Sequence, residues 1–266
     1  MYARSSHSGM ESIYLTEEHV ALRDQVARFL AKEVEPHGEA WEEQGFVPRE
    51  LLRKMGELGF FGITYPAEYG GAEADALTAL VFAEAVSRTT FGGFAATVLV
   101  HTDMASPHLV NAGSREQLDK YLPAVIRGER ITAVAVTEPD AGSDVAAIRT
   151  RARRDGDGWV LNGTKMFITN GVHADLYFVA ARTDPEAKGS HGISMFIVEK
   201  GFQGVVFHRR SVLLFLPQSG AKRFATSSSI TSVAPPPMDS TRESRARRSM
   251  ALSRMYPIPP WNCWQV

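Results

Sequence analysis

Two segments of this sequence carry side chains that suit a flat ligand with a polar edge. The first, residues 134–144, reads VAVTEPDAGSD, an apolar run that ends in a loop rich in hydroxyl and backbone N–H groups. Such a loop can hold a polar ring edge or a phosphate without charged side chains. Taken alone, this pattern is more often an ordinary β-turn.

The second segment, residues 163–171, reads GTKMFITNG and ends in the Asn-Gly pair of a tight turn. Alternation along a strand predicts that Phe167 and Thr169 point to the same face. That face can stack a flat ring on the aromatic side chain and offer a hydroxyl to a ring heteroatom. Taken alone, this segment is more often a plain hairpin strand.

Helical spacing in the first half of the chain supplies the scaffold for these segments. Apolar residues recur at intervals of three and four, and capping residues precede several of the stretches. Ser114 and Gln117, for example, match a capping box. Helices are therefore expected from Thr16 to Pro36, from Pro48 to Gly59, after Asp75, over 94–110 and from Ser114 to about Pro123.

The pattern changes to short strands at Ile131. Five apolar or β-branched runs are separated by turn signals such as Asn162-Gly163 and Asn170-Gly171. A helical block followed by a strand block predicts an α+β fold with a small antiparallel β domain, built as a sandwich or a barrel. The expected strands are 131–136, 159–161, 165–169, 176–181 and 193–198.

The composition changes again near the C-terminal end. Residues 221–266 hold seven Lys and Arg against two Asp and Glu, with eight Ser, six Pro and no Gly. No helical or strand period continues there, which predicts a disordered tail. The expected division is an α-helical domain at 1–128, a central β domain at 129–207 and a tail at 208–266.

The totals exclude several classes of protein. The chain has 266 residues and a net charge of -1, which gives no electrostatic argument for nucleic acid. The single cysteine, Cys263, rules out an internal disulfide or a CxxC metal site. No apolar run approaches the roughly 18 residues of a membrane span. The start resembles neither a secretory signal nor a transit peptide, so the expected compartment is the cytoplasm, with the mitochondrial matrix as the alternative.

Together the two segments resemble the first signature of the acyl-CoA dehydrogenase family. VTEPDAGSD is followed at the family's spacing by the run WVLNGTKMFITNG. The likeness extends from about Leu15 to Gly204, and it includes the stretches GFFGI at 59–63 and PAEYGG at 66–71. The stretch HGISMFIVE at 191–199 is similar to the long-chain branch of the family.

The resemblance implies an α-helical domain, a central β domain and a C-terminal four-helix bundle, with FAD bound beside the β domain. Thr137 and the backbone near Val136 would meet the pyrimidine edge of the flavin, and Thr169 would lie near its N5 atom. Ser143 would also reach the acyl-CoA substrate. The implied cofactor-binding residues are Val134, Val136, Thr137, Gly142, Ser143, Phe167, Ile168 and Thr169.

The family reaction is α,β-dehydrogenation of an acyl-CoA to a trans-2-enoyl-CoA. A glutamate removes the α proton, and the electrons pass to an electron-transfer flavoprotein. Family members form homo-oligomers. An acyl-CoA oxidase or a flavin monooxygenase-like relative is a close variant, which the oxygen reactivity of the reduced flavin would distinguish.

The resemblance stops before the bundle that carries the catalytic glutamate. After Glu199 the only glutamate is Glu243, which lies among arginines and has nothing to orient it as a base. Glu138 is expected to be a structural hydrogen-bond acceptor. The catalytic base is therefore unknown, and the alternative to an active enzyme is a truncated, inactive fragment that binds FAD or acyl-CoA weakly. A shifted reading frame or a misjoined gene model is our hypothesis for the loss of pattern.

Other candidate sites have simpler interpretations. His101, His108 and His173 lack metal-ligand spacing and are expected to be structural or solvated, so no metal site is predicted. The arginines at 245–248 and the tryptophans at 261 and 264 are expected to be solvated, because no nucleic-acid recognition module accompanies them.

Overall fold

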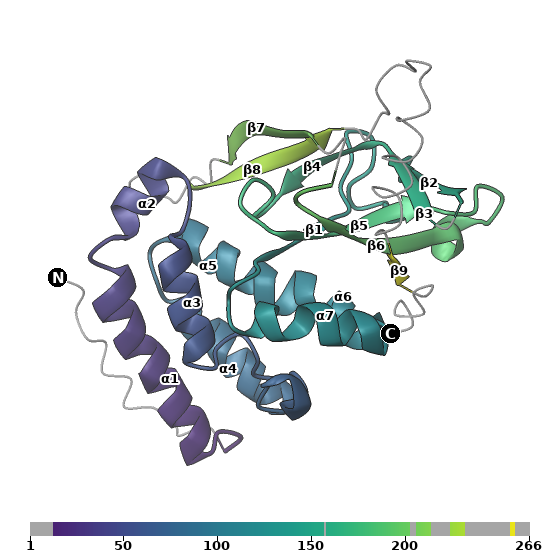
Figure 1. The fold of residues 1–266 in the computed structure, drawn as a ribbon. Helices are drawn as coiled ribbons and strands as arrows, with labels where there is room; N and C mark the ends of the chain where they lie inside the picture. The colour runs from purple at the N-terminus through teal and green to yellow at the C-terminus, as the bar shows by residue number, and fades with distance from the viewer. Residues whose placement is uncertain (1–12, 157, 203–205, 214–223, 232–255, 259–266) are drawn as a thin grey trace.

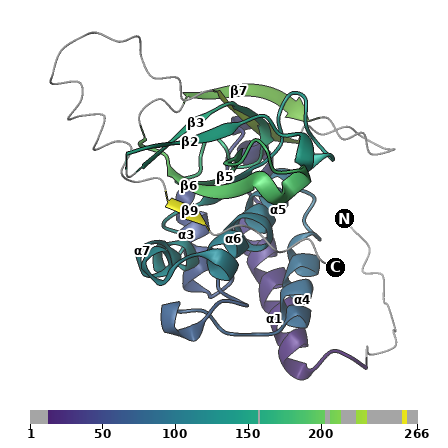
Figure 2. The ribbon, with the colours of Figure 1, turned by 90° about the vertical axis from the view of Figure 1, so that its right-hand side faces the viewer.

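The structure is a computed structural model that describes residues 13–156, 158–202, 206–213, 224–231 and 256–258. A layer of helices lies on one side of the molecule, and two β-sheets lie on the other (Figure 1). The view turned by 90° keeps the same separation of helices and strands (Figure 2). The predicted α+β class, with a helical block followed by a small β domain, is confirmed.

The helical domain holds seven α-helices among the described residues, and two of them continue directly into π-helical turns. The α-helices are α1 (Glu17–Phe29), α2 (Gly38–Gln44), α3 (Arg49–Glu57), α4 (Ala76–Val86), α5 (Gly92–Leu99), α6 (Ser106–Ala112) and α7 (Arg115–Ile126). The π-helical turns are η1 (Leu30–Val34), which follows α1, and η3 (Val100–Ala105), which joins α5 to α6. The 3₁₀ turns are η2 (Ala67–Tyr69), η4 (Val145–Ala147) and η5 (Gly189–Gly192).

Capping residues place the helix ends close to the predicted positions. The Asp75 carboxylate accepts a hydrogen bond from the Thr78 backbone N–H at 2.8 Å at the start of α4. The Ser114 capping box also forms, but α7 continues past Pro123 to Ile126. The sequence did not predict α2, a seven-residue helix that begins at a glycine. A Cβ at Gly38 would lie 2.1 Å from the Phe91 ring, so this glycine allows the chain to pass closely.

The strands that the structure describes form two sheets. The larger has the order β3-β2-β5-β6-β9, with β1 also paired to β5, and the smaller has the order β4-β8-β7. Strand β1 runs parallel to β5, so the larger sheet is mixed where only antiparallel pairs were expected. The parallel pair follows from the topology, because three strands and several turns separate β1 from β5 along the chain. The strands are β1 (Thr132–Ala135), β2 (Arg151–Asp155), β3 (Gly158–Asn162), β4 (Thr164–Ile168), β5 (Leu176–Arg182), β6 (Ile193–Glu199), β7 (Val206–Leu213), β8 (Phe224–Thr231) and β9 (Tyr256–Ile258).

Most of the predicted tail, 208–266, lies outside the described residues. The parts that the structure describes are strands: the end of β7, all of β8 and all of β9. Strand β8 pairs with both β4 and β7, and β9 pairs with β6. These segments differ from the expected disorder because strand pairing through backbone hydrogen bonds needs no hydrophobic alternation.

Among the described residues, three buried clusters hold the layers together. One fills the helical domain around Val34, Met55 and Val98, and a second joins helices α6 and α7 to the larger sheet. The third lies between the two sheets and contains Tyr177 and Phe196. Each cluster is apolar and close to fully buried, so the β domain is fixed to the helices on one face and to its own second sheet on the other.

A partly exposed ion pair between Arg49 and Asp175 connects the helical domain to the β domain. Arg49, the first residue of α3, donates to both carboxylate oxygens of Asp175, at 2.5 and 3.0 Å, and to the His173 carbonyl. Asp175 also accepts the Ile131 backbone N–H at 2.8 Å. One carboxylate therefore joins α3, the start of β1 and the turn before β5.

We expect Asp175→Ala to lower the free energy of unfolding by about 1–3 kcal/mol, because it removes the carboxylate that accepts from the Arg49 guanidinium and from the Ile131 backbone N–H. Urea denaturation measures the change. Glu84→Ala is the control, since the Glu84–Arg88 pair is more than half exposed and should contribute less than about 0.5 kcal/mol. Equal losses for the two variants would contradict the assignment of Asp175 as a tie between the domains.

Candidate functional site

A cleft of about 450 Å³ lies between the β domain and the helices, and both predicted segments reach it. Six of the eight predicted cofactor-binding residues line it, three from each segment. The opposite wall comes from η3 and α6. The lining residues from the β domain are Val134, Val136, Thr137, Phe167, Ile168 and Thr169, and those from the helices are Val100, Asp103, Met104, Pro107, His108 and Asn111.

The first segment enters the cleft from the end of β1 and then turns away. Glu138 and Ala141 close a tight turn through a backbone hydrogen bond of 2.8 Å. Beyond this turn, Gly142 and Ser143 are exposed and do not line the cleft. A Cβ at Gly142 would meet nothing within 4 Å, so the loop is open at this point.

The second segment lies beside the first and is joined to it by a backbone hydrogen bond. The Met166 N–H donates to the Thr137 carbonyl at 2.9 Å. The simple alternation predicted for this strand is interrupted, because the pairing register shifts between Lys165 and Ile168 and Phe167 has a φ of 58°. This irregularity leaves the Phe167 side chain 51% exposed at the cleft.

A buried ion pair clamps the two segments together. Lys165 Nζ donates to Glu138 Oε1 at 2.7 Å and to the Val136 carbonyl at 2.8 Å. The Glu138 carboxylate also accepts the backbone N–H groups of Arg149 and Thr150, at 2.6 and 3.0 Å. The expectation that Glu138 is a structural acceptor agrees with this geometry. Both side chains are at most 5% exposed, so the pair is shielded from water.

The surroundings of this pair keep the carboxyl group ionised. Burial acts to raise the pKa of Glu138, but hydrogen bonds from Lys165, Thr150 and Arg149 outweigh it, and the pKa lies below its ordinary value. Burial lowers the pKa of Lys165, and Glu138 opposes this shift. Glu138 is therefore committed to structure and is not available to remove protons from a ligand.

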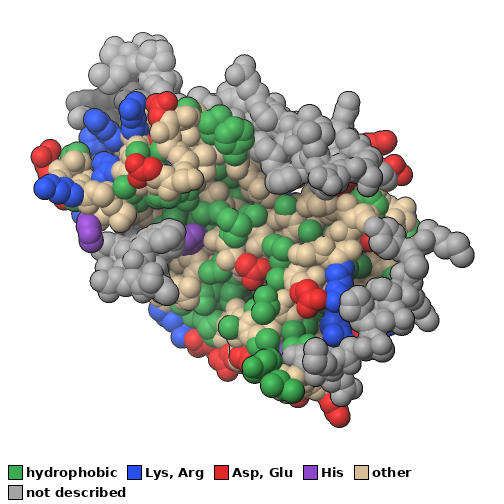
Figure 3. All heavy atoms as spheres, turned by 180° about the vertical axis from the view of Figure 1, so that it is seen from behind, with side chains coloured by type: hydrophobic (Ala, Val, Ile, Leu, Met, Phe, Trp, Pro, Cys, Tyr) green, Lys and Arg blue, Asp and Glu red, His purple; other side chains and the backbone are tan. Residues whose placement is uncertain are grey.

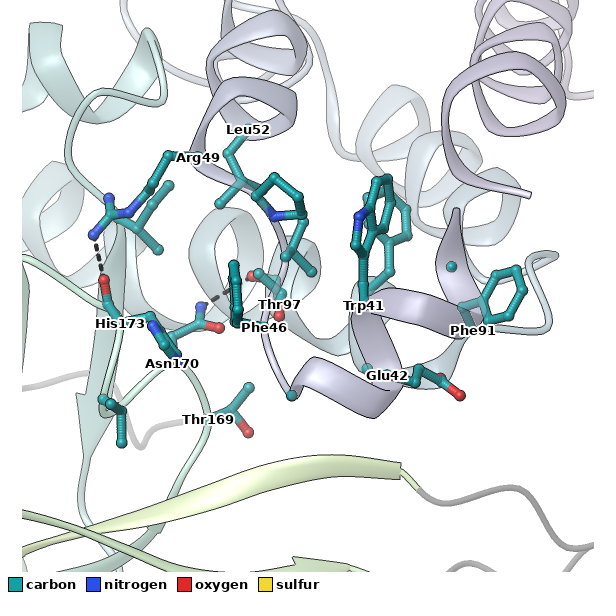
Figure 4. Close-up of a pocket in the computed structure, with 18 of the residues that line it drawn as sticks. Trp41, Glu42, Phe46, Arg49, Leu52, Phe91, Thr97, Thr169, Asn170 and His173 are labelled. Carbon is teal, nitrogen blue, oxygen red and sulfur yellow. Dashed lines mark hydrogen bonds between the residues drawn. The ribbon is translucent and has the colours of Figure 1, made fainter. Parts of the chain in front are cut away.

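The residue after Thr169 fixes the end of the second segment against the helices. Asn170 has a φ of 65°. Its side-chain amide donates to the carbonyl of Thr97 on α5 at 3.0 Å and to that of Thr132 on β1 at 3.2 Å. Figure 4 shows Asn170 beside Thr169 at a second cavity, of about 420 Å³, whose wall includes Trp41 and Phe46. Thr169 lines both cavities.

The helical wall of the cleft was not predicted from the sequence. The sequence does contain polar residues inside the apolar stretch 94–110, which could have indicated a binding wall. The face on which these side chains lie depends, however, on the π-helical turn η3. Burial lowers the pKa of His108 to about 4, so its ring is neutral at neutral pH. Burial also raises the pKa of Asp103, and a hydrogen bond from the Thr102 hydroxyl opposes this. Asp103 is the one carboxylate among the described residues that line the cleft.

The other histidines and the remaining candidate residues lie elsewhere. His101 is buried between η3, β1 and α7, as expected for a structural histidine, and His173 packs on Phe46 with ring centroids 5.4 Å apart. Glu243 and the arginines at 245–248 lie outside the described residues. Within the part of the chain that the structure describes, no group of three metal-binding side chains forms, and no helix has the length and apolar character of a membrane span.

Comparison with known proteins identifies the fold. Residues 16–129 match the family model of the acyl-CoA dehydrogenase N-terminal domain, and residues 133–214 match that of the acyl-CoA dehydrogenase middle domain. The chain belongs to the acyl-CoA dehydrogenase family. The recognition based on the two signature segments is thereby confirmed.

Relatives of this acyl-CoA dehydrogenase chain include mammalian and bacterial proteins. The long-chain specific acyl-CoA dehydrogenase of Mus musculus is 40% identical over 227 residues, covering 78% of this chain and 52% of the mouse protein. An acyl-CoA dehydrogenase structure from Geobacillus kaustophilus superposes with a TM-score of 0.74 at 40% identity, covering 84% of this chain and 57% of that one. An acyl-CoA dehydrogenase from Bacillus anthracis, solved as a complex with FAD, has a TM-score of 0.71 at 36% identity and covers 83% of this chain and 36% of that one. The chain thus spans about half the length of the curated relatives it matches.

For this acyl-CoA dehydrogenase chain we expect Glu138→Gln to lower the free energy of unfolding by about 3–5 kcal/mol at neutral pH, because Lys165 would remain buried without a countercharge. Folding lowers the pKa of Glu138, so its contribution is present above the ordinary carboxyl pKa and is lost as the pH falls through the folded-state value. The difference between wild type and variant should therefore shrink in acid.

Urea denaturation at a series of pH values checks this prediction. Glu186→Gln provides the control, because Glu186 is exposed and its substitution should change stability by less than about 0.5 kcal/mol. A difference between Glu138→Gln and wild type that stayed constant between about pH 7 and about pH 3 would contradict the assigned pKa direction.

Proposed function

We propose that this chain forms the FAD- and acyl-CoA-binding walls of an acyl-CoA dehydrogenase, an enzyme that converts an acyl-CoA to a trans-2-enoyl-CoA. The observation that carries the proposal is the convergence of the two signature segments on one cleft. Their residues lie some thirty positions apart in the sequence, and the backbone bond from Met166 to Thr137 and the Glu138–Lys165 pair join them.

The cleft has the properties that a flavin ring requires. Its volume of about 450 Å³ lies within the usual range for cofactor sites. The half-exposed Phe167 ring offers a flat apolar surface, and Thr137 and Thr169 place hydroxyl-bearing side chains on the same wall. When bound, FAD supplies the acceptor for the hydride that leaves the β carbon of the substrate.

Each wall has a separate task in this proposal. Phe167 stacks on the ring, while the Thr137 and Thr169 hydroxyls donate hydrogen bonds to its polar edge. On the helical side, Val100, Met104 and the neutral His108 exclude water from the space next to the ring. Gly142 and Ser143, in the open loop beyond, are proposed to meet the pyrophosphate, and Ser143 the acyl-CoA.

The partners and compartment follow from the same proposal. Electrons pass to an electron-transfer flavoprotein, and the complete enzyme is a homo-oligomer, because both are implied by membership of the family. The proposed compartment is the cytoplasm, with the mitochondrial matrix as the alternative that cell fractionation would identify. The division at 128/129 and at 207/208 is the proposed domain organisation, and limited proteolysis tests it.

We expect the purified chain to bind FAD, seen as quenching of flavin fluorescence during titration. Phe167→Ala should weaken binding by about tenfold through loss of the stacking surface. Thr137→Val and Thr169→Val should each weaken it by about three- to tenfold, because each removes one hydrogen bond. Thr183→Val is the control, since the Thr183 hydroxyl bonds to Ser194 outside the cleft. A folded chain that leaves excess FAD unbound would refute the proposal.

The alternative function, an inactive fragment that binds FAD or acyl-CoA weakly, is favoured by one feature of the cleft. Within the part of the chain that the structure describes, no glutamate lines the cleft, and Glu138 is held in its ion pair. Exposed hydrophobic side chains such as Leu80, at 64%, are consistent with a surface that another part of the enzyme would cover. Figure 3 shows hydrophobic side chains across the middle of one face, with acidic side chains among them.

We expect no acyl-CoA-dependent reduction of an electron-accepting dye above the rate of an enzyme-free blank, because the described residues that line the cleft include no glutamate, the residue type of the family's base. The sample is loaded with FAD and assayed with a range of acyl chain lengths, so that a lack of turnover cannot result from missing cofactor or an unsuitable substrate. Turnover above the blank would overturn the inactive alternative. Loss of that turnover in Asp103→Asn, with FAD binding unchanged, would then identify Asp103 as the group that takes the proton.

A further inference from the structure

The helical wall of the cleft contains a backbone carbonyl whose expected hydrogen-bond donor is absent, because a proline occupies the donor position. In η3 the hydrogen bonds run from residue i to residue i−5, as in the bond from the Ser106 N–H to the His101 carbonyl. The next acceptor in this register is the Thr102 carbonyl, and its donor would be residue 107. Residue 107 is a proline, which has no N–H.

The Tyr65 hydroxyl takes the place of the missing N–H. It donates to the Thr102 carbonyl at 2.6 Å, and the bond is buried. Tyr65 lies in the loop before η2, far from η3 in sequence, and is 4% exposed. Burial raises the pKa of its hydroxyl, which therefore stays protonated and able to donate. A carbonyl left without a partner at this depth would be costly, so the hydroxyl stabilises the π-helical turn over an ordinary α-helical one.

The opposite side of the same turn is fixed by a second set of buried hydrogen bonds. His101 Nδ1 lies 2.9 Å from the Thr132 hydroxyl on β1, and His101 Nε2 lies 3.1 Å from the Val125 carbonyl on α7. The Ser106 hydroxyl lies 3.0 Å from that of Thr132. Burial lowers the pKa of His101 to about 4, so the network is uncharged at neutral pH. The turn is thus held between β1, α7 and the Tyr65 loop.

We infer that Tyr65 is a positioning residue that sets the shape of the helical wall of the cleft by holding η3 in its π-helical register. A π-helical turn contains one residue more than an α-helical turn, and one residue corresponds to about 100° of rotation along a helix. Loss of the register would turn Val100 and Met104 relative to Pro107 and His108, all of which line the cleft. This inference rests on the proposed function, since it takes the cleft to receive an acyl chain.

The test measures which acyl chains the cleft prefers. Binding of butyryl-, octanoyl- and palmitoyl-CoA to the FAD-loaded chain is followed by calorimetry for wild type and Tyr65→Phe. We expect the ratio of long-chain to short-chain affinity to change by about three- to tenfold in Tyr65→Phe, the effect of one lost hydrogen bond on a wall. Tyr177→Phe is the matched control, because Tyr177 is a buried tyrosine that donates to the Ala174 carbonyl at 2.9 Å, away from η3. It should leave the ratio unchanged.

A second variant tests the physical cause. Pro107→Ala restores a backbone N–H that can reach the Thr102 carbonyl, so the Tyr65 hydroxyl should become dispensable. In the Pro107→Ala background, Tyr65→Phe should shift the affinity ratio by less than about twofold. If Tyr65→Phe alone fails to fold, a Pro107→Ala/Tyr65→Phe double variant that folds with its amide exchange in η3 restored supports the same conclusion.

Hydrogen exchange of the backbone amides in η3 separates the possible failures. Faster exchange in Tyr65→Phe with an unchanged affinity ratio would mean that Tyr65 is only structural, which overturns the inference and leaves the proposed function intact. An effect of Tyr65→Phe that persists in full in the Pro107→Ala background also overturns it. Failure of the wild-type chain to bind any acyl-CoA, with normal exchange protection in η3, would refute the proposed function and the inference with it.

Discussion

The geometry of the cleft depends on one buried ion pair, between Glu138 and Lys165. An isolated charge at this depth would be strongly unfavourable. The pair is stable there because each charged group has further hydrogen-bond partners: the carboxylate accepts from two backbone N–H groups, and the ammonium donates to a backbone carbonyl. The same contacts bring the end of β1 against β4. The ion pair therefore holds the segment with Thr137 beside the segment with Phe167, and together these two segments form the β-domain wall of the cleft.

Departures from regular backbone geometry gather around this cleft. Phe167 and Asn170 have positive φ values, β4 is irregular between Lys165 and Ile168, and η3 is a π-helical turn. Each departure redirects a side chain: Phe167 toward the cleft, Asn170 toward the carbonyls of Thr97 and Thr132. Buried hydrogen bonds and packing hold these conformations, which is the usual condition for strain at a binding site.

Local rules in the sequence were enough for the helical domain and for the existence of the β domain. The Asp75 and Ser114 caps, and the apolar spacing of α3, placed helix starts within a residue or two. The short helix α2 was not predicted, because its seven residues, starting at Gly38, are too few to show helical spacing of apolar residues. The two signature segments could also be recognised in the sequence, because VTEPDAGSD and GTKMFITNG combine a strand, a turn and polar side chains at fixed spacing.

The sequence by itself determined the family, the α+β order of elements and the β-domain residues that line the cleft, since each of these depends on neighbours in the chain. Only the tertiary structure decided the other wall. Whether Asp103 and Met104 face the cleft depends on a π-helical register that Tyr65 stabilises from a distant loop, and the parallel pairing of β1 with β5 depends on the path of the chain between them. Both are long-range contacts, which a local pattern does not encode.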